Sequence, residues 1–217
     1  MTSRRSPLPS HERRWQRRPD ERPRTLMESA MKLLLKRGYG RVSLDEVAAD
    51  AGVSKATVYH YFSGKDDLLT RSLSQRMAEK QDEIERYVAR AGGSAAKRLQ
   101  LYLQEFWVRN LRPQAGLWQQ MLVSEIAADA PEVFAAWARG FVARWQSVER
   151  LIRDGQRTGE FRQDADAHAA ARTIMSSLTH QALFHVHLGM HRFSPYDRDR
   201  LCKSLVNQFL RGLRKHS

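Results

Sequence analysis

The sequence has little of what defines several common protein classes. A single cysteine, Cys202, among 217 residues excludes an intramolecular disulfide framework and a multi-cysteine zinc site, and we expect it to be a small core residue. The longest stretch without formal charge, residues 173–191, contains four histidines with Ser, Thr and Gln, so it does not predict a membrane span. The arginine-rich start lacks the apolar segment of a secretory signal. We therefore expect a cytoplasmic protein.

Patterns of β-structure and of catalysis are also missing. No alternating apolar and polar run of useful length is present, and no internal repeat, which leaves an all-α fold. The sequence contains no glycine-rich phosphate loop, no Gly-x-Ser-x-Gly elbow and no metal-hydrolase helix. We predict that the chain is not an enzyme and has no cofactor.

What the sequence has in excess is positive charge. Lys and Arg number 37 against 24 Asp and Glu, a formal net charge of +13, which favours a polyanionic partner. Residues 1–23 are rich in Arg and Pro and predict a basic flexible arm. This arm could contact a DNA groove or phosphates, or it could serve only as a solubilising tail, and the sequence does not favour either.

Three- and four-residue spacing of apolar side chains predicts about nine helices. We divide the chain after the arm into a small head, residues 24–70, and a larger body, residues 71–217. The expected helices span residues 25–38, 44–51, 54–62, 66–90, 95–111, 114–129, 131–154, 164–189 and 195–214.

The second and third segments have the form of a helix-turn-helix, whose second helix enters the major groove of DNA. Ser43 and Glu46 form a capping box at the start, and Gly52 suits the left-handed backbone of the turn. With residues about 100° apart around a helix, Val58 and Phe62 fall on the inward side of the third segment. The opposite side carries side chains suited to reading DNA: Lys55, Ala56, Thr57, Tyr59 and His60.

Turn, helix phasing and spacing agree with one known family over the runs Val42–Ala48, Ala51–Phe62 and Lys65–Leu69. Residues 24–70 closely resemble the tetracycline-repressor (TetR) family of bacterial transcriptional regulators. The resemblance implies a ligand-responsive, sequence-specific regulator, usually a repressor, that binds double-stranded operator DNA as a homodimer. It also implies that phosphates contact Tyr59 and Lys65, and that bases or nearby backbone contact Lys55, Ala56, Thr57 and His60.

Hydroxyl and ammonium groups near helix starts are further candidates for phosphate contact. Lys65 opens the fourth helix, whose N-terminal N–H groups favour an anion. Thr25 and Ser43 offer neutral donors, although helix capping explains both equally well. A nonspecific architectural nucleic-acid-binding protein is the alternative function.

The body carries an uncharged stretch that indicates a homodimer. Residues 173–191 contain no Asp, Glu, Lys or Arg, and a helix without a charged face must be covered on most sides. The last helix offers a complementary apolar stripe, so two helices from each chain would form a four-helix interface. The expected interface residues are Leu178, Phe184, His187, Leu201, Leu205 and Phe209.

Bulky apolar side chains recur through the middle of the body. Most of them belong to a core, and the surplus of aromatics predicts the wall of a pocket for an apolar or aromatic effector. Glu125 lies on the same apolar face, either paired with an arginine or open to a cationic ligand, and we favour the pair. The candidate ligand-binding residues are Trp107, Trp118, Met121, Glu125, Phe134, Trp137, Phe141, Trp145 and His180.

Three histidines, His180, His187 and His191, are spaced by seven and four residues and would share one helix face. That spacing is compatible with a metal effector. No cysteine or carboxylate cluster accompanies them in the sequence. Hydrogen-bonded interface or pocket histidines are therefore the better interpretation, and we assign no metal site.

Overall fold

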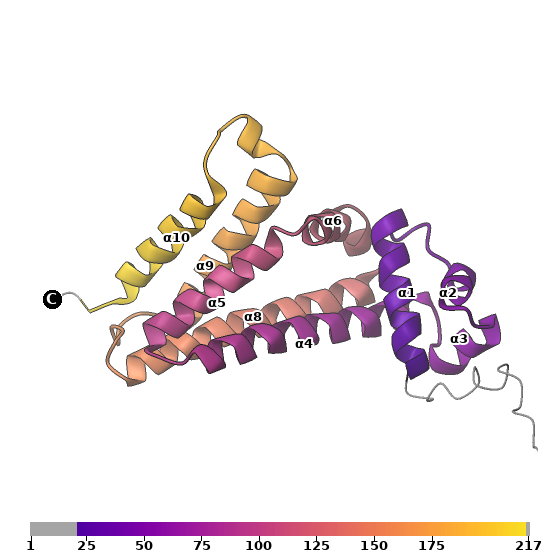
Figure 1. Ribbon diagram of the computed structural model, residues 1–217, viewed down its shortest axis with the longest axis horizontal. Helices are drawn as coiled ribbons and strands as arrows, with labels where there is room; N and C mark the ends of the chain where they lie inside the picture. The colour runs from indigo at the N-terminus through magenta and orange to yellow at the C-terminus, as the bar shows by residue number, and fades with distance from the viewer. Residues whose placement is uncertain (1–20, 216–217) are drawn as a thin grey trace, which may run out of the picture.

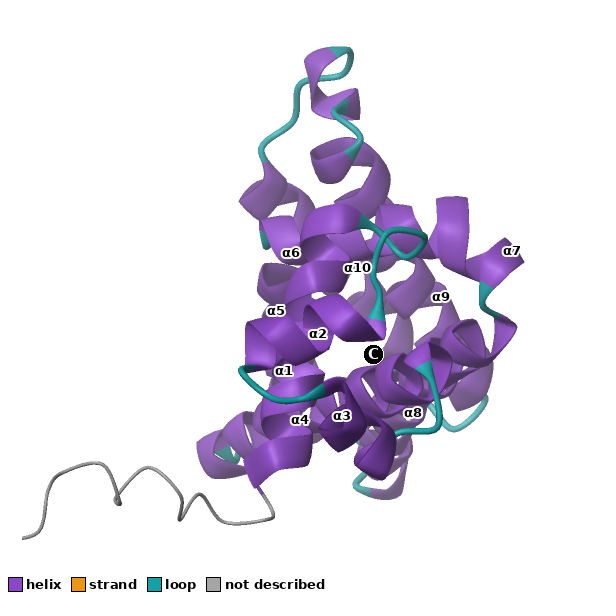
Figure 2. Ribbon diagram, turned by 90° about the vertical axis from the view of Figure 1, so that its right-hand side faces the viewer, coloured by secondary structure: helices purple, strands orange, loops and turns teal. Residues whose placement is uncertain are grey.

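Helices make up the fold over residues 21–215, the part that a computed structural model describes apart from the side chains of residues 122 and 123. Figure 2 shows only helices and loops in this part, and a single bridge between Phe161 and Arg214 is its one strand-like pairing. The predictions of an all-α fold and of about nine continuous helical runs are confirmed for these residues.

The head consists of the helices α1 (Glu21–Arg37), α2 (Leu44–Ala51) and α3 (Lys55–Tyr61). The predicted capping box is present, since the Ser43 hydroxyl accepts the Glu46 N–H and the Glu46 carboxylate accepts the Ser43 N–H. α2 ends at Gly52, whose φ of 67° places it in the left-handed region that favours glycine. These local signals fix the turn between α2 and α3.

The first helix begins at Glu21, earlier than the expected start at Thr25. Glu21 lies in the first turn and Lys36 and Arg37 in the last, so the charges at both ends suit the helix dipole. The predicted arm, residues 1–23, lies outside the described residues except where it forms the first turn of α1.

The long α4 (Lys65–Ala91) starts in the head and carries the chain into the body. The remaining elements are α5 (Ala95–Asn110), α6 (Pro113–Met121), the π-helical η2 (Leu122–Ile126), α7 (Ala127–Asp129), α8 (Pro131–Arg157), α9 (Ala167–His180), the π-helical η3 (Gln181–His187), the 3₁₀ turn η4 (Met190–Arg192) and α10 (Arg198–Leu213).

α4 and α8 lie side by side along the long axis of the molecule, and α9 and α10 lie at the end away from the head (Figure 1). α4 and α8 run in the same direction, as the residue numbers of the contacting pairs show by increasing together along both helices. Gln81 donates to the Ser147 hydroxyl at 2.7 Å, and one turn further Arg150 lies 3.0 Å from Glu85. α5 packs against both helices.

Two hydrophobic clusters form the core of the described residues. The first joins α1, α2, α3 and the start of α4 to Met121, Ile126 and Val133 of the body. The second fills the far half of the body between α4, α5, α8, α9 and α10. Because the first cluster crosses the boundary between head and body, the two parts pack against each other rather than being joined only by a linker.

The expected straight helix over residues 164–189 is wrong. α9 ends at His180, the backbone widens into the π-helical η3, and Gly189 with a φ of 77° stops the run. Apolar periodicity does not distinguish a π-helical turn from an α-helical one over so few residues. The expected start of the last helix at Pro195 is also early, since Asp197 caps α10 by accepting the Arg200 N–H.

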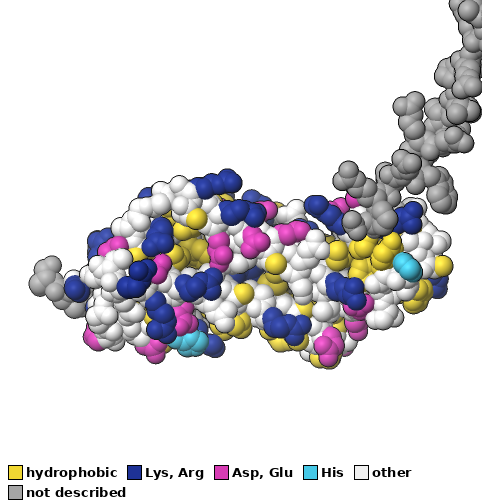
Figure 3. Space-filling model, turned by 90° about the horizontal axis from the view of Figure 1, so that it is seen from below, with side chains coloured by type: hydrophobic (Ala, Val, Ile, Leu, Met, Phe, Trp, Pro, Cys, Tyr) yellow, Lys and Arg dark blue, Asp and Glu magenta, His cyan; other side chains and the backbone are white. Residues whose placement is uncertain are grey.

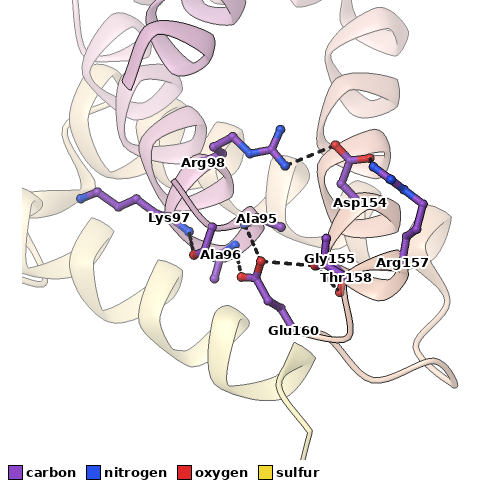
Figure 4. A network of polar contacts seen from close by, with 10 residues as sticks. Ala95, Ala96, Lys97, Arg98, Asp154, Gly155, Arg157, Thr158 and Glu160 are labelled. Carbon is purple, nitrogen blue, oxygen red and sulfur yellow. Dashed lines mark hydrogen bonds and ion pairs between the residues drawn. The ribbon is translucent and has the colours of Figure 1, made fainter. Parts of the chain in front are cut away.

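The turn between α8 and α9 is fixed on the start of α5 (Figure 4). Glu160 accepts the N–H groups of Ala96 at 3.0 Å and Ala95 at 2.8 Å, and the bond from Ala96 is the main cause that lowers the pKa of this carboxyl. Next to it, the Phe161 ring is fully buried against Gly155. This turn therefore orients the far end of the body.

Candidate DNA-binding surface and effector cavity

α3 lies at the end of the molecule that the head forms (Figure 1), and the face predicted to read DNA is exposed there. The Tyr59 side chain is 52% exposed, whereas Val58 and Phe62 are buried in the head core. The predicted outward residues are exposed or partly exposed: Lys55, Ala56, Thr57, Tyr59 and His60. Tyr61 is partly buried and packs against the head core, which agrees with leaving it without a base contact.

Two side chains of this face have partners within the head. Lys55 Nζ lies 2.9 Å from the Asp45 carboxylate of α2, and the hydrogen bond between them raises the pKa of Lys55. The hydroxyls of Ser54 and Thr57 lie 2.9 Å apart. Contact with DNA would require Lys55 to exchange Asp45 for a phosphate or a base edge.

Lys65 lies at the start of α4, where its ammonium group contacts Tyr39. Lys65 Nζ donates to the Tyr39 carbonyl at 3.0 Å and lies 3.8 Å from the centre of the Tyr39 ring. The first turn of α4 also contains Asp67, which accepts the Ser63 N–H at 3.0 Å and pairs with Arg71 at 2.8 Å. An anionic side chain thus already occupies part of the helix N-terminus that we expected to attract phosphate.

Thr25 and Ser43 both make hydrogen bonds inside the head. Thr25 lies inside α1 and its hydroxyl donates to the Glu21 carbonyl at 3.0 Å. Ser43 forms the capping box of α2 with Glu46. Both residues therefore have a hydrogen-bond partner within the protein, and Ser43 is a helix cap.

Basic side chains are not gathered over the head on the face drawn in Figure 3. Lys and Arg lie along the whole length of this face, interspersed with Asp and Glu. Several head cations are paired: Lys32 lies 2.6 Å from Asp50, and Arg37 contacts Glu46. The excess of charge alone therefore does not mark the DNA-binding surface on this face.

The body contains a partly open cavity between α1, α4, α5, α6 and α8. Its lining combines aromatic and aliphatic side chains with a few amide and charged groups, the composition that is typical of a ligand pocket. The lining residues are Met31, Leu35, Leu73, Arg76, Met77, Lys80, Ile84, Phe106, Arg109, Asn110, Gln114, Ala115, Trp118, Gln119, Trp137, Phe141 and Arg144.

Three of the expected ligand-binding residues lie together in this cavity: Trp118, Trp137 and Phe141. Trp137 stacks on Phe141 with 5.2 Å between ring centres, so they form an aromatic wall on α8. The other expected residues lie elsewhere. Trp107 and Met121 are buried in the core, Phe134 packs on the head cluster, Trp145 faces Arg172, and His180 is exposed and stacked on Phe184.

Glu125 joins the body to the head. Its carboxylate accepts the backbone N–H of Tyr39 at 2.8 Å, directly after α1, and packs over Gly38. The favoured arginine pair is thus wrong, because the structural partner is a main-chain donor. The Tyr39 hydroxyl in turn donates to Asp66 at 2.7 Å, and burial with this bond raises the pKa of Tyr39 to about 12. A chain of contacts therefore connects η2 to the start of α4.

The four cations of the cavity were not among the predicted ligand-binding residues. Arg76 and Lys80 lie four residues apart on α4, within the apolar stripe that Leu73, Met77 and Ile84 form. Basic residues inside an apolar stripe were the available indication. Arg109 and Arg144 come from other helices, and no local pattern relates them to α4.

An exposed apolar surface covers η3, η4 and the loop before α10. Phe193 is 84% exposed and Phe184 is 42% exposed, and Leu188, Met190 and Tyr196 extend the same region. The expected interface residues differ in their placement. Leu178 is fully buried inside the chain, so its side chain is not available to a partner. Stripe residues with partly exposed side chains are Leu201, Leu205 and Phe209.

The three histidines do not share a helix face, because η3 and Gly189 interrupt the helix between them. The His187 ring nitrogen lies 2.7 Å from the Asn110 carbonyl, and that of His191 lies 2.8 Å from the His185 carbonyl. Their partners are thus main-chain oxygens. Over residues 21–215 no group of three His, Cys, Asp or Glu side chains is arranged to hold a metal ion.

None of the helices over residues 21–215 combines the length and apolar character needed to cross a membrane. The architecture defines a class of protein: an all-helical fold with a helix-turn-helix head and a body that contains a cavity. Comparison with known families agrees with this class. Residues 26–71 match the model of bacterial regulatory proteins of the tetR family, and residues 97–212 match that of the AefR-like transcriptional repressor, C-terminal domain.

The chain belongs to the TetR family of bacterial transcriptional regulators, with an AefR-like C-terminal domain. Both matching models describe transcriptional regulators, and the second describes the C-terminal domain of a transcriptional repressor. Members of this family are regulators without enzymatic activity, which agrees with the prediction that the chain is not an enzyme.

Individual relatives are similar over much of the chain. The transcriptional regulator AcuR of Cereibacter sphaeroides is 28% identical over 157 residues, which are 69% of either chain. The first curated relatives are covered over 35% to 69% of their own length. FadR of Bacillus subtilis, solved with stearoyl-CoA, superimposes with a TM-score of 0.69 at 17% identity, covering 88% of this chain and 99% of FadR. A transcriptional regulator of Saccharomonospora viridis, solved with choline, gives 0.68 at 20% identity, covering 91% and 100%. At these identities the structures establish the shared fold.

Proposed function

We propose that two copies of this chain bind a roughly palindromic operator through α3 and release it when a small molecule occupies the cavity. The course of α4 is the observation that supports this proposal most directly. This helix starts beside α3 at Lys65, and its next turns line the cavity with Arg76 and Lys80. A ligand that displaces α4 therefore displaces the head, and the two heads no longer match successive major grooves.

The exposed face of α3 reads the operator in this proposal. A small Ala56 allows close approach to the groove, and the exposed His60 ring is placed to contact base edges. Tyr59 and Lys65 bind phosphates, since the Lys65 ammonium group donates one hydrogen bond to the Tyr39 carbonyl and has further donors for a phosphate. The proposed contact set is Thr25, Ser43, Lys55, Ala56, Thr57, Tyr59, His60 and Lys65.

Selection of bound sequences from a random duplex pool tests this function. We expect one enriched, roughly palindromic sequence, which the protein prefers over random duplex by at least ~10³ in a competition titration. A binder without an enriched sequence would instead be the nonspecific architectural protein. The His60→Ala variant should change the sequence preference, whereas Lys65→Ala should weaken all duplexes alike and reduce the salt slope by about one. A uniform loss for His60→Ala would remove its base-reading role.

The effector acts through coupling between cavity and head. α6 lines the cavity, and the carboxylate of Glu125, in the turn that follows α6, accepts the Tyr39 N–H beside Lys65. We assign the transmission of the effector signal to this connection. Coupling is reciprocal, so operator DNA must weaken effector binding by the factor by which effector weakens DNA binding. Equal effector affinity with and without operator would contradict the mechanism.

An apolar or aromatic effector suits the wall formed by Trp118, Trp137 and Phe141. The ligands of two structural relatives do not decide its charge, since stearoyl-CoA carries phosphates and choline is a cation.

The exposed apolar surface around Phe184 and Phe193 supports a homodimer through η3 and α10. His187 lies on η3 but its ring is directed at Asn110, so it supports the shape of the interface rather than contacting the partner.

Three further proposals concern the rest of the chain. The basic arm adds salt-dependent contacts to DNA, and the protein works in the cytoplasm. Head and body divide near residue 70, inside α4.

A further inference from the structure

The cavity is lined by cations and by no carboxylate. Four of its lining side chains are basic, from α4, α5 and α8, whereas α1 and α6 contribute apolar and amide groups. A cavity that binds only apolar ligands would not be expected to contain ammonium and guanidinium groups, because burial of an unpaired charge is unfavourable. The charge of the lining therefore carries information about the ligand.

Arg109 is the one cavity cation that is neutralised within the described residues. It lies 2.6 Å from Glu83 and 3.5 Å from Glu105. For Arg76, Lys80 and Arg144, no described carboxylate lies within the 4.0 Å of an ion pair. Burial and the surrounding arginines lower the pKa of Lys80 to about 8, and burial lowers the pKa of Arg144.

Lys80 of α4 and Arg144 of α8 lie at the same level along these two parallel helices. On one side of this level Met77 lies against Gly140, and on the other Gln81 donates to Ser147 at 2.7 Å. Two like charges on adjacent helices repel each other, and Arg144 is one of the charges that lower the Lys80 pKa. An anion between them removes this repulsion and adds charge-assisted hydrogen bonds.

We infer that the cavity binds an amphipathic anion, with a carboxylate or phosphate head group at Lys80, Arg144 and Arg76 and an apolar body along the wall of Trp118, Trp137 and Phe141. This inference rests on the proposed function, of which it specifies the effector class. The anion links α4, which carries the head, to α8. A cationic ligand is excluded from this site by the same charges.

Titration calorimetry with undecanoate, decyl phosphate, decan-1-ol and decyltrimethylammonium tests the inference on the full chain, since all four probes carry the same ten-carbon tail. The two anions distinguish a carboxylate from a phosphate source. We expect at least one anion to bind about tenfold or more tightly than the alcohol, and the ammonium compound to bind weakest. Equal or tighter binding of the alcohol or the ammonium compound, or no binding of either anion at millimolar concentration, overturns it.

Lys80→Met and Arg144→Met assign the head-group site. Each variant should lose about tenfold or more in affinity for the preferred anion while it keeps its affinity for decan-1-ol, which also shows that it is folded. Arg86→Met, exposed on the same helix, is the matched control and should bind as the wild type does. Anion affinity unchanged in both cavity variants overturns the assignment.

The outcome separates this inference from the proposed function. Anion binding without an effect on the affinity for the selected operator leaves the site in place and removes its role as effector site. Failure to select any operator sequence would contradict the proposed function, whereas the calorimetry would still test whether the cavity binds an anion.

Discussion

Lys80 is the residue whose ionisation the cavity perturbs most clearly. Its pKa of about 8 lies below the ordinary 10.5 because it is buried among Arg76, Arg144, Arg112 and Arg109, whereas the lining residues of α1 and α6 do not titrate. The free protein at neutral pH therefore holds Lys80 mostly charged. The unfolded chain binds this proton more tightly than the folded chain between pH 8 and 10.5, so the contribution of Lys80 to stability rises with pH in that window.

A bound anion reverses the shift, because it raises the Lys80 pKa toward its ordinary value. Affinity for the preferred decyl anion should therefore fall as pH rises above about 8, by at most about tenfold per pH unit. Calorimetry at pH 7 and at pH 9.5 measures this, and both decyl anions stay ionised between these values. Lys80→Met should show no such fall. An equal fall in the variant would place the titrating group elsewhere.

Gly155 shows how a single hydrogen atom can decide packing. A Cβ there would lie 2.1 Å from the ring of Phe161, which is fully buried in the turn that Glu160 holds on α5. Gly155→Ala should lower the free energy of unfolding by about 1–3 kcal/mol through overpacking, in spite of the better helix propensity of alanine.

Gly212→Ala is the matched control, since this α10 glycine has nothing within 4 Å of the added Cβ. It should instead raise the stability by about 0.5–1 kcal/mol. Denaturant unfolding of both variants gives the comparison. A neutral or stabilising Gly155→Ala would mean that the Phe161 ring moves aside without loss.

At the scale of elements, the connection from η2 to the head is the clearest target. Glu125→Ala removes the acceptor of the Tyr39 N–H, whereas Glu125→Gln keeps an oxygen there. The alanine variant should bind operator within a few-fold of wild type and lose roughly tenfold of the effector's influence on DNA affinity. Titrations of operator with and without saturating effector measure that ratio. Glu132→Ala, exposed at the start of α8, is the control. Full coupling in Glu125→Ala would remove Glu125 from the path.

Elements also differ in how far the sequence predicts them. The helix-turn-helix could be predicted because its determinants are local: Ser43 and Glu46 at one end of α2 and Gly52 at the other. The course of residues 181–187 could not, since a π-helical turn keeps the composition and nearly the spacing of an α-helix. Glu125 was predicted to face a pocket or an arginine, and its actual partner could not be predicted because the Tyr39 N–H lies 86 residues away and is a main-chain group.

The cavity is a property of the whole molecule and was only partly predictable. Aromatic periodicity on one helix identified Trp137 and Phe141, because a stripe on a single helix is visible in sequence. The same reasoning included Trp145, which the turn of α8 directs to Arg172. The arrangement of Arg76, Lys80 and Arg144 depends on how α4 and α8 pair, and a single sequence contains no measure of that pairing.

The dimer is the last step from chain to function, because a palindromic operator requires two heads at a fixed spacing. Phe184 is exposed on η3 and Phe193 beside it, and both would be covered in the proposed interface. Phe184→Glu places a carboxylate in that apolar contact, and the penalty of burying it should raise the dimer Kd by at least about 100-fold. The same variant should lose affinity for the full operator while its heads stay folded.

Sedimentation at micromolar concentration measures the change, with Tyr87→Glu as control, since Tyr87 is similarly exposed on α4. The control should sediment as a dimer and bind operator as wild type does. A dimeric Phe184→Glu would place the interface elsewhere on the body. A wild-type monomer that still prefers a palindromic operator would mean that the dimer forms only on DNA. Each half-site would then bind one copy of the chain, and the apolar surfaces of the two copies would come into contact after binding.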